Sequence, residues 1–270
     1  MLFVRIIGLV ITVVLLLTHN CLLCSPENNM ENVVIIVFDD ETLKYFGGKI
    51  ENRIIDAEVI DKLQRSDARC IFYDFHFFGA SGNKYADNLL IDTVSRSNKL
   101  ILPRSNEIRS KIKKPYLFEP ILDNLKYADH SLAIGDHCSI KDMISFNDES
   151  FYSSYEAVIA SMVTGKSIQL LKGYKIEISI SDTNPSRLSI ERLLLLDMDS
   201  INKIVAGKAV IVGSTIIGVA VPLACVDPCD KPIWELDAIA VVANTLISTL
   251  EKTPGVGQLG PRVAPASCCR

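Results

Sequence analysis

Val33–Phe38 (VVIIVF) is a run of six apolar, mostly β-branched residues that leads directly into Asp39-Asp40-Glu41-Thr42 (DDET). A short apolar run of this kind is typical of a strand buried on both faces of a parallel sheet. The acids that follow it would then stand at the carboxyl end of the strand. This stretch therefore predicts an α/β fold with polar side chains at one edge of its sheet.

Strand-like and helix-like segments alternate along the rest of the chain. The expected strands cover residues 33–38, 70–73, 99–102, 174–180 and 208–212, and the expected helices cover residues 53–68, 85–95, 116–125, 153–163, 190–196 and 234–250. Alternation at these intervals is the pattern of a parallel sheet with crossover helices. We therefore expect an α/β domain with a mostly parallel sheet and helices on both faces.

The two ends of the chain differ in composition from its middle. Arg5 precedes an uncharged, mostly apolar run at residues 6–17, and residues 2–24 nearly reach the roughly 20 residues that span a bilayer. We expect residues 1–24 to form one transmembrane signal anchor, with a cleaved signal peptide as the alternative. Arg5 would stay inside the cell and the remainder would be exported. Residues 33–252 would form the domain, and residues 253–270, rich in glycine and proline, a disordered or non-native tail.

Charge and spacing exclude several functions. The net charge of −4 and the pI near 5.6 argue against nucleic acid as a partner, because phosphate binding needs a basic face. His130, His137 and Cys138 do not have the spacing of a tetrahedral zinc site, so we expect no metal or cofactor. Gly165-Lys166-Ser167 resembles the end of a P-loop, but helical residues precede it, and we expect a helix end there.

Three expected strands end in polar residues. Asp39 and Asp40 follow the first strand, Asp74 follows the second, and Gly213-Ser214-Thr215 follows the last. Ligands of open parallel sheets bind outside the carboxyl ends of the strands, so these six residues are the candidate ligand-binding site. The alternative is that Asp39 and Asp74 only cap the turns that follow them.

A catalytic role for Asp39 is a further alternative. Haloacid-dehalogenase phosphatases begin with a similar strand and an Asp-x-Asp pair, in which the first acid attacks phosphorus and the second protonates the leaving oxygen. Here the second acid would be Glu41, and the usual glycine before Thr42 is absent. We therefore favour a protein without catalysis of its own.

Four blocks of sequence, in this order, resemble the CHASE2 family of extracytoplasmic sensor domains, which belong to bacterial receptor kinases and cyclases. The blocks are VIIVFDDETLKYFGG (34–48), DARCIFYDFHFF (67–78), LILP (100–103) and GKAVIVGSTIIG (207–218). The chain departs from the family pattern where Val221 replaces an Asp and Asp237 replaces a His. The W-P-W-P that the family carries ahead of Arg53 is also missing.

The resemblance implies a sensory domain that binds an unidentified small signal and is normally coupled to a cytoplasmic kinase or cyclase. It also implies a single-pass protein of the inner membrane with its domain in the periplasm, and a homodimer is one expected assembly. Because the residues after Leu250 resemble neither a second span nor an output domain, we expect a truncated receptor or a stand-alone sensor. An exported interaction domain without a ligand is the other alternative.

Cys225 and Cys229 flank Val226-Asp227-Pro228. Asp-Pro favours a turn, and an oxidising compartment favours closure of paired cysteines, so these two residues are a candidate disulfide. Two buried or free thiols are the alternative.

Overall fold

The computed structural model describes residues 30–48, 52–103, 115–118, 126–128, 139–143, 154–171, 175–179, 185–216, 222–226 and 232–253. Within these residues one six-stranded sheet has the order β4-β3-β2-β8-β1-β7. All of its neighbouring strands run parallel, which confirms the α/β fold predicted from the sequence. Its strands are β1 (Val33–Phe38), β2 (Cys70–Tyr73), β3 (Leu100–Pro103), β4 (Lys126–Ala128), β7 (Arg187–Ser189) and β8 (Ala209–Ser214).

The centre of the sheet consists of three strands that are distant in the sequence. β8 lies between β1 and β2, with Ile35 of β1 opposite Ile211 and Phe72 of β2 opposite the same residue. Every residue of β1 and β2 is buried, which explains why their sequences are continuous apolar runs instead of alternating ones. The order β2-β8-β1 brings the carboxyl ends of these three strands to one stretch of the sheet edge.

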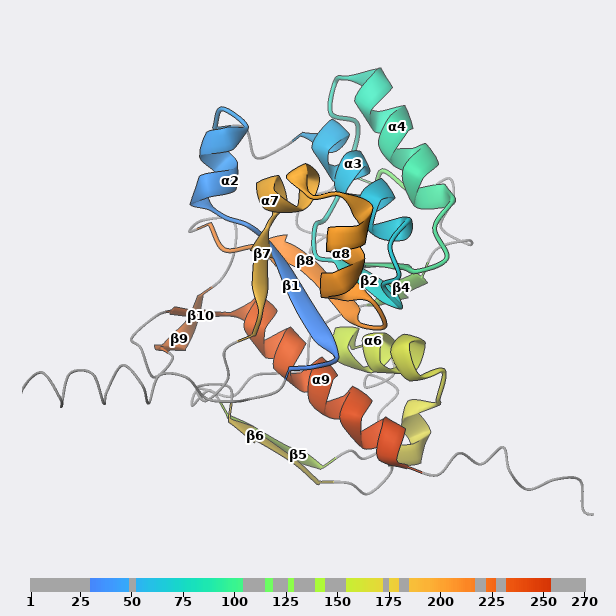
Figure 1. Cartoon of the computed structure of the whole chain (residues 1–270), viewed down its shortest axis with the longest axis vertical. Coiled ribbons are helices and arrows are strands. Elements are labelled where there is room, and N and C mark those ends of the chain that lie inside the picture. The colour runs from blue at the N-terminus through green and yellow to red at the C-terminus, as the bar shows by residue number, and fades with distance from the viewer. Residues whose placement is uncertain are drawn as a thin grey trace, which may run out of the picture.

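Helices cover both faces of the sheet (Figure 1). Because successive side chains of a strand point to opposite faces, Ile35 joins one hydrophobic core and Ile36 joins the other. The core that contains Ile35 includes residues of α6 (Tyr155–Thr164) and α9 (Glu235–Lys252). The core that contains Ile36 includes residues of α3 (Arg53–Gln64), α4 (Lys84–Ser95), α7 (Ile190–Leu195) and α8 (Met198–Val205).

Several elements differ from the sequence prediction. A short helix, α2 (Asp40–Tyr45), follows β1 directly, where we expected a turn. α3 ends at Gln64 and not at residue 68. Just beyond this end, the Ser66 hydroxyl donates a 2.6 Å hydrogen bond to the carbonyl of Leu63. Tyr116 forms an isolated bridge with Phe78, so the helix predicted for residues 116–125 does not begin there, and residues 119–125 lie outside the described residues.

Two pairs of antiparallel strands lie outside the main sheet. β6 (Lys175–Ser179), which was expected as a strand, pairs with β5 (Ser139–Met143). β9 (Pro222–Val226) pairs with β10 (Pro232–Trp234), which leads directly into α9.

No helix among the described residues is both long and apolar enough to cross a membrane. The anchor predicted for residues 1–24 lies outside the described residues, as does the predicted tail after Thr253. Both remain predictions.

Candidate functional site

The carboxyl ends of β1 and β8 are joined by hydrogen bonds. The backbone N–H of Thr215 donates to the carbonyl of Phe38 at 3.0 Å, and the Ser214 hydroxyl donates to the same carbonyl at 3.2 Å. Asp39 is the next residue after Phe38, so it stands beside Ser214 and Thr215. Gly213 and Ser214, predicted to follow the strand, are its last two residues, because β8 pairs with β1 through Ser214.

Asp39 caps the helix that follows it. Its Oδ1 accepts a 2.9 Å hydrogen bond from the backbone N–H of Thr42, which satisfies one of the free donors at the start of α2. Asp40 lies in the first turn of α2 and is exposed, as is Glu41. Asp39 thus caps α2, as the capping alternative expected, and its part in ligand binding stays a prediction. Asp40 follows Asp39 in the chain and is exposed to solvent.

Asp74 occupies the carboxyl end of β2 beside β8. Its backbone N–H donates a 2.7 Å hydrogen bond to the carbonyl of Val212, and its Cβ is 3.5 Å from the position that a Cβ on Gly213 would take. Within the part of the chain that the structure describes, no group donates a hydrogen bond to its carboxylate. The capping alternative is thus not observed for Asp74.

The environment of Asp74 favours a protonated carboxyl. Burial raises the pKa of Asp74 to about 7, and the negative charge of Glu235 contributes to the rise. The residue as a whole is only partly buried, so the carboxyl is desolvated while part of the residue stays accessible. A desolvated carboxyl that accepts no hydrogen bond from the described residues is able to bind a ligand that donates one.

Two groups that the sequence did not indicate interact electrostatically with Asp74: Glu235 of α9 and Tyr155 of α6. Burial raises the pKa of Tyr155, and the charges of Asp74, Glu235 and Glu156 raise it further. Glu156 is buried and Glu235 is partly buried. The sequence predicted both helices but did not show which helix ends would meet the end of β2.

An aromatic cluster lies beside these acids. The His76 ring stacks on Phe78 with centroids 5.7 Å apart, and Phe78 stacks on Tyr116 at 4.7 Å. Burial lowers the pKa of His76, and its buried Nδ1 has no hydrogen-bond partner among the described residues. The neutral ring therefore adds an acceptor or donor near the strand end without adding a charge.

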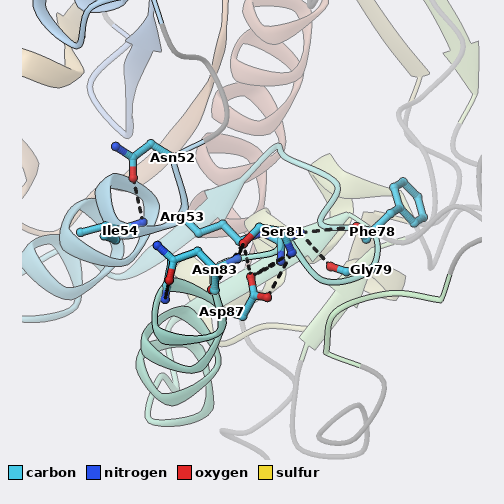
Figure 2. A network of polar contacts seen from close by, with 9 residues as sticks. Asn52, Arg53, Ile54, Phe78, Gly79, Ser81, Asn83 and Asp87 are labelled. Atoms are coloured by element: carbon cyan, nitrogen blue, oxygen red, sulfur yellow. Dashed lines mark hydrogen bonds and ion pairs between the residues drawn. The ribbon is translucent and has the colours of Figure 1, made fainter.

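The loop that carries His76 and Phe78 is tied to two helices by a buried ion pair (Figure 2). Arg53, at the start of α3, pairs with Asp87 of α4 and donates a 2.8 Å hydrogen bond to the carbonyl of Gly79. The Ser81 hydroxyl donates to Asp87 at 2.7 Å. Burial opposes ionisation of this carboxyl, but the hydrogen bonds from Ser81 and Arg53 hold the pKa of Asp87 below its usual value. This network fixes the course of the chain after Asp74.

The start of α9 is fixed by a second ion pair. Nη2 of Arg187, in the edge strand β7, lies 2.6 Å from each carboxylate oxygen of Asp237. Asp237 also accepts a 2.8 Å hydrogen bond from the backbone N–H of Trp234. Asp237 thus caps α9 and links its first turn to the sheet.

The predicted disulfide and possible metal ligands are considered next. Cys225 lies in β9, whereas Cys229 lies outside the described residues, so the disulfide remains a prediction. Among the described residues, no group of three or more His, Cys, Asp or Glu side chains is arranged to hold a metal ion. The acids at the sheet edge therefore offer hydrogen-bond acceptors and negative charge, and Asp74 also offers a proton.

Comparison with known proteins gives no match: no family model, curated protein or solved structure is similar to this chain.

Proposed function

We propose that this chain carries an extracytoplasmic sensory domain that binds a small ligand at the carboxyl edge of its parallel sheet and has no catalysis of its own. The four sequence blocks that resemble CHASE2 support the sensory role. The observation that carries the binding site is Asp74, whose desolvated carboxyl accepts no hydrogen bond from the described residues and lies at the point where β2 meets β8. Ligands of parallel sheets bind at this edge.

The position of Asp39 favours binding over phosphoryl transfer. A nucleophilic carboxylate needs a free oxygen aimed at the substrate and an acid two residues later that can reach the leaving group. One oxygen of Asp39 accepts the Thr42 N–H, and Glu41 is exposed on α2. The phosphatase alternative thus has its first acid used as a helix cap and its second acid exposed on the helix surface.

The phosphatase alternative is tested by an assay with p-nitrophenyl phosphate and Mg²⁺. We expect the purified protein to give no hydrolysis above the blank without enzyme. Asp39→Asn is the matched variant, because Asn caps helices as well as Asp and leaves α2 intact. Turnover that disappears in Asp39→Asn would replace the sensory proposal with the phosphatase.

The binding proposal is tested by thermal unfolding against a defined panel of primary amines, amino acids, dicarboxylates and sugar phosphates. We expect at least one compound class to raise the melting temperature, because a ligand that binds only the folded state stabilises it. A panel without effect on the melting temperature, together with specific binding of a protein partner, would favour the ligand-free interaction domain.

Export is tested separately in cells. We expect the full chain to stay in membranes through alkaline carbonate washing, held by residues 1–24, and external protease to cleave near residues 111–114. Recovery of the full-length chain in the cytosol would contradict the extracytoplasmic location.

A further inference from the structure

A basic residue directly precedes three neighbouring strands of the sheet. Arg69, Lys99 and Lys208 come immediately before β2, β3 and β8, which lie side by side in the order β3-β2-β8. The backbone N–H of Arg69 donates to the carbonyl of Lys208 at 2.9 Å, and that of Ile71 donates to the carbonyl of Lys99 at 2.9 Å. These three cations therefore form one cluster at the amino ends of the strands, which we call the basic edge.

The side chains of the basic edge bond to neutral groups. Nη1 of Arg69 donates a 2.9 Å hydrogen bond to the carbonyl of Val163, and Nζ of Lys99 donates one of 2.7 Å to the carbonyl of Ser66. Within the described residues, none of the three cations forms an ion pair with an acid. Arg69 is exposed, and Lys99 and Lys208 are partly exposed. Their positive charge is therefore directed to the solvent side of this edge.

Acids near the basic edge do not outnumber its cations. Arg65 and Asp61, at the end of α3, form an exposed 2.8 Å pair in which the two charges balance. The remaining exposed acids close to the amino ends of the strands and to the end of α9 are Glu31, Asp67 and Glu251, and the end of α9 adds the cations Lys166 and Lys252. The described amino edge thus carries more positive than negative charge, although the net charge of the whole chain is −4.

The chain enters the domain beside the basic edge. The backbone N–H of Ala209, the residue after Lys208, donates a 2.8 Å hydrogen bond to the carbonyl of Asn32. The Asn32 backbone N–H donates to Oδ1 of Asn244 at 3.2 Å, and its side chain donates to the Ser248 hydroxyl at 3.0 Å. The point of entry is therefore fixed between β8 and α9, next to one of the three cations.

The anchor predicted for residues 1–24 ends only a few residues before this point. Met30 already packs against the hydrophobic core, so residues 25–29 alone separate the domain from the predicted anchor. The steps from residue 24 to Met30 extend at most about 20 Å. With the anchor in a bilayer, this tether holds the amino edge near the bilayer surface, and the charge of that edge determines which way the sheet points.

We propose that the basic edge docks on anionic lipid headgroups, so that the amino edge of the sheet faces the membrane and the candidate ligand-binding edge faces away from it. Cations close to an anionic bilayer surface are attracted to it, and the attraction extends over about one Debye length. The inference rests on the anchor of the proposed function, and it adds a second contact with the membrane and an orientation for the ligand site.

Quenching of tryptophan fluorescence measures which edge lies at the bilayer. The full chain is reconstituted in vesicles of phosphatidylcholine and phosphatidylglycerol in which some headgroups carry a nitroxide quencher. Trp234 is the single tryptophan, so Trp234→Phe allows one reporter to be placed at each edge. Asn98→Trp, at an exposed residue before Lys99, reports from the basic edge, and Tyr45→Trp, at an exposed residue of α2, reports from the carboxyl side. We expect strong quenching of the first reporter and weak quenching of the second.

The dependence on charge identifies the contact. Lys208→Gln should shift the equilibrium between docked and undocked domains about fivefold toward the undocked form, the factor expected for one cation at an anionic surface. The matched control is Lys44→Gln, which removes an exposed lysine of α2 and should change nothing. Vesicles without phosphatidylglycerol should weaken the quenching at the basic edge, as should about 1 M salt, where the Debye length is about 3 Å. The lipid comparison leaves the basic edge unchanged, so it decides if Lys208→Gln does not fold.

Equal quenching of the two reporters would overturn the docking. So would quenching of the Asn98→Trp reporter that is the same with and without phosphatidylglycerol. Both results are obtained with the chain inserted in the vesicles, whereas a chain that does not enter them would overturn the predicted anchor and the docking together. No small ligand is added, so neither result bears on the proposed ligand binding.

Discussion

The ammonium group of Lys166 donates hydrogen bonds of 2.8 Å to the carbonyls of Leu250 and Thr253, at the carboxyl end of α9. The last carbonyls of a helix have no partner within it, and a cation there also interacts favourably with the helix dipole. Lys166 comes from the turn after α6, so this contact joins the two helices that cover one face of the sheet.

We predict that Lys166→Met lowers the free energy of unfolding by about 1–2 kcal/mol, because the carbonyls lose a charged donor while the side-chain volume stays similar. The matched control is Lys252→Met, since Lys252 lies in the last turn of the same helix but is exposed. Urea unfolding of both variants checks this. Equal losses would mean that the cap contributes nothing specific.

The buried pair of Arg53 and Asp87 should contribute far more to stability than an exposed pair. Their side chains are 11% and 8% exposed, so Asp87→Ala leaves a buried guanidinium without its partner, at a cost of about 3–5 kcal/mol. The control is Asp61→Ala, which breaks the pair with Arg65, whose side chains are 42% and 63% exposed, and should cost less than about 0.5 kcal/mol. Similar losses in urea unfolding would argue against this network as a structural clamp.

The close contact of Leu236 with Gly213 predicts a coupled pair of variants. Gly213→Ala should destabilise by about 1–3 kcal/mol through overpacking, and Leu236→Ala by about 2–5 kcal/mol through loss of buried side chain. In the double variant the added methyl enters the space that Leu236 leaves, so the combined loss should be smaller than the sum. Additive losses would show that the two positions do not pack against each other.

Stability should depend on pH through Asp74. The pKa of Asp74 is about 7 in the folded chain and about 3.9 in an unfolded one, so between about pH 4 and pH 7 only the folded chain holds this proton. Stability relative to Asp74→Asn should therefore fall as the pH rises through this window and stay constant above it. The total difference should not exceed about 4 kcal/mol. A difference that is independent of pH in urea unfolding would contradict the raised pKa.

The residues at the carboxyl edge of the sheet could be predicted because the end of each strand is visible in the local sequence. Buried parallel strands are continuous apolar runs, and the residues after Phe38, Tyr73 and Val212 are therefore the residues at its carboxyl edge. Gly165 was expected at a helix end, and it closes α6 with a φ of 66°, which glycine adopts readily.

The strand order and the groups near Asp74 could not be predicted, because they depend on contacts between segments distant in the sequence. Nothing in the sequence shows that β8 lies between β1 and β2, or that Glu235 and Tyr155 meet Asp74. α2 was missed because DETLKY is too short and too polar to show a helical period, and the Asp39 cap was the only local signal for it.

The most direct test of the central claim, that Asp74 belongs to a ligand-binding edge, is calorimetry with the panel compound that stabilises the protein most. At a pH above about 7, where Asp74 is ionised, Asp74→Asn should bind this compound about ten- to a hundredfold more weakly, the loss expected for one hydrogen bond to a charged group. Glu58→Gln, which changes an exposed acid on α3, should bind it with unchanged affinity. Equal affinities of Asp74→Asn and the unmodified chain would contradict the account.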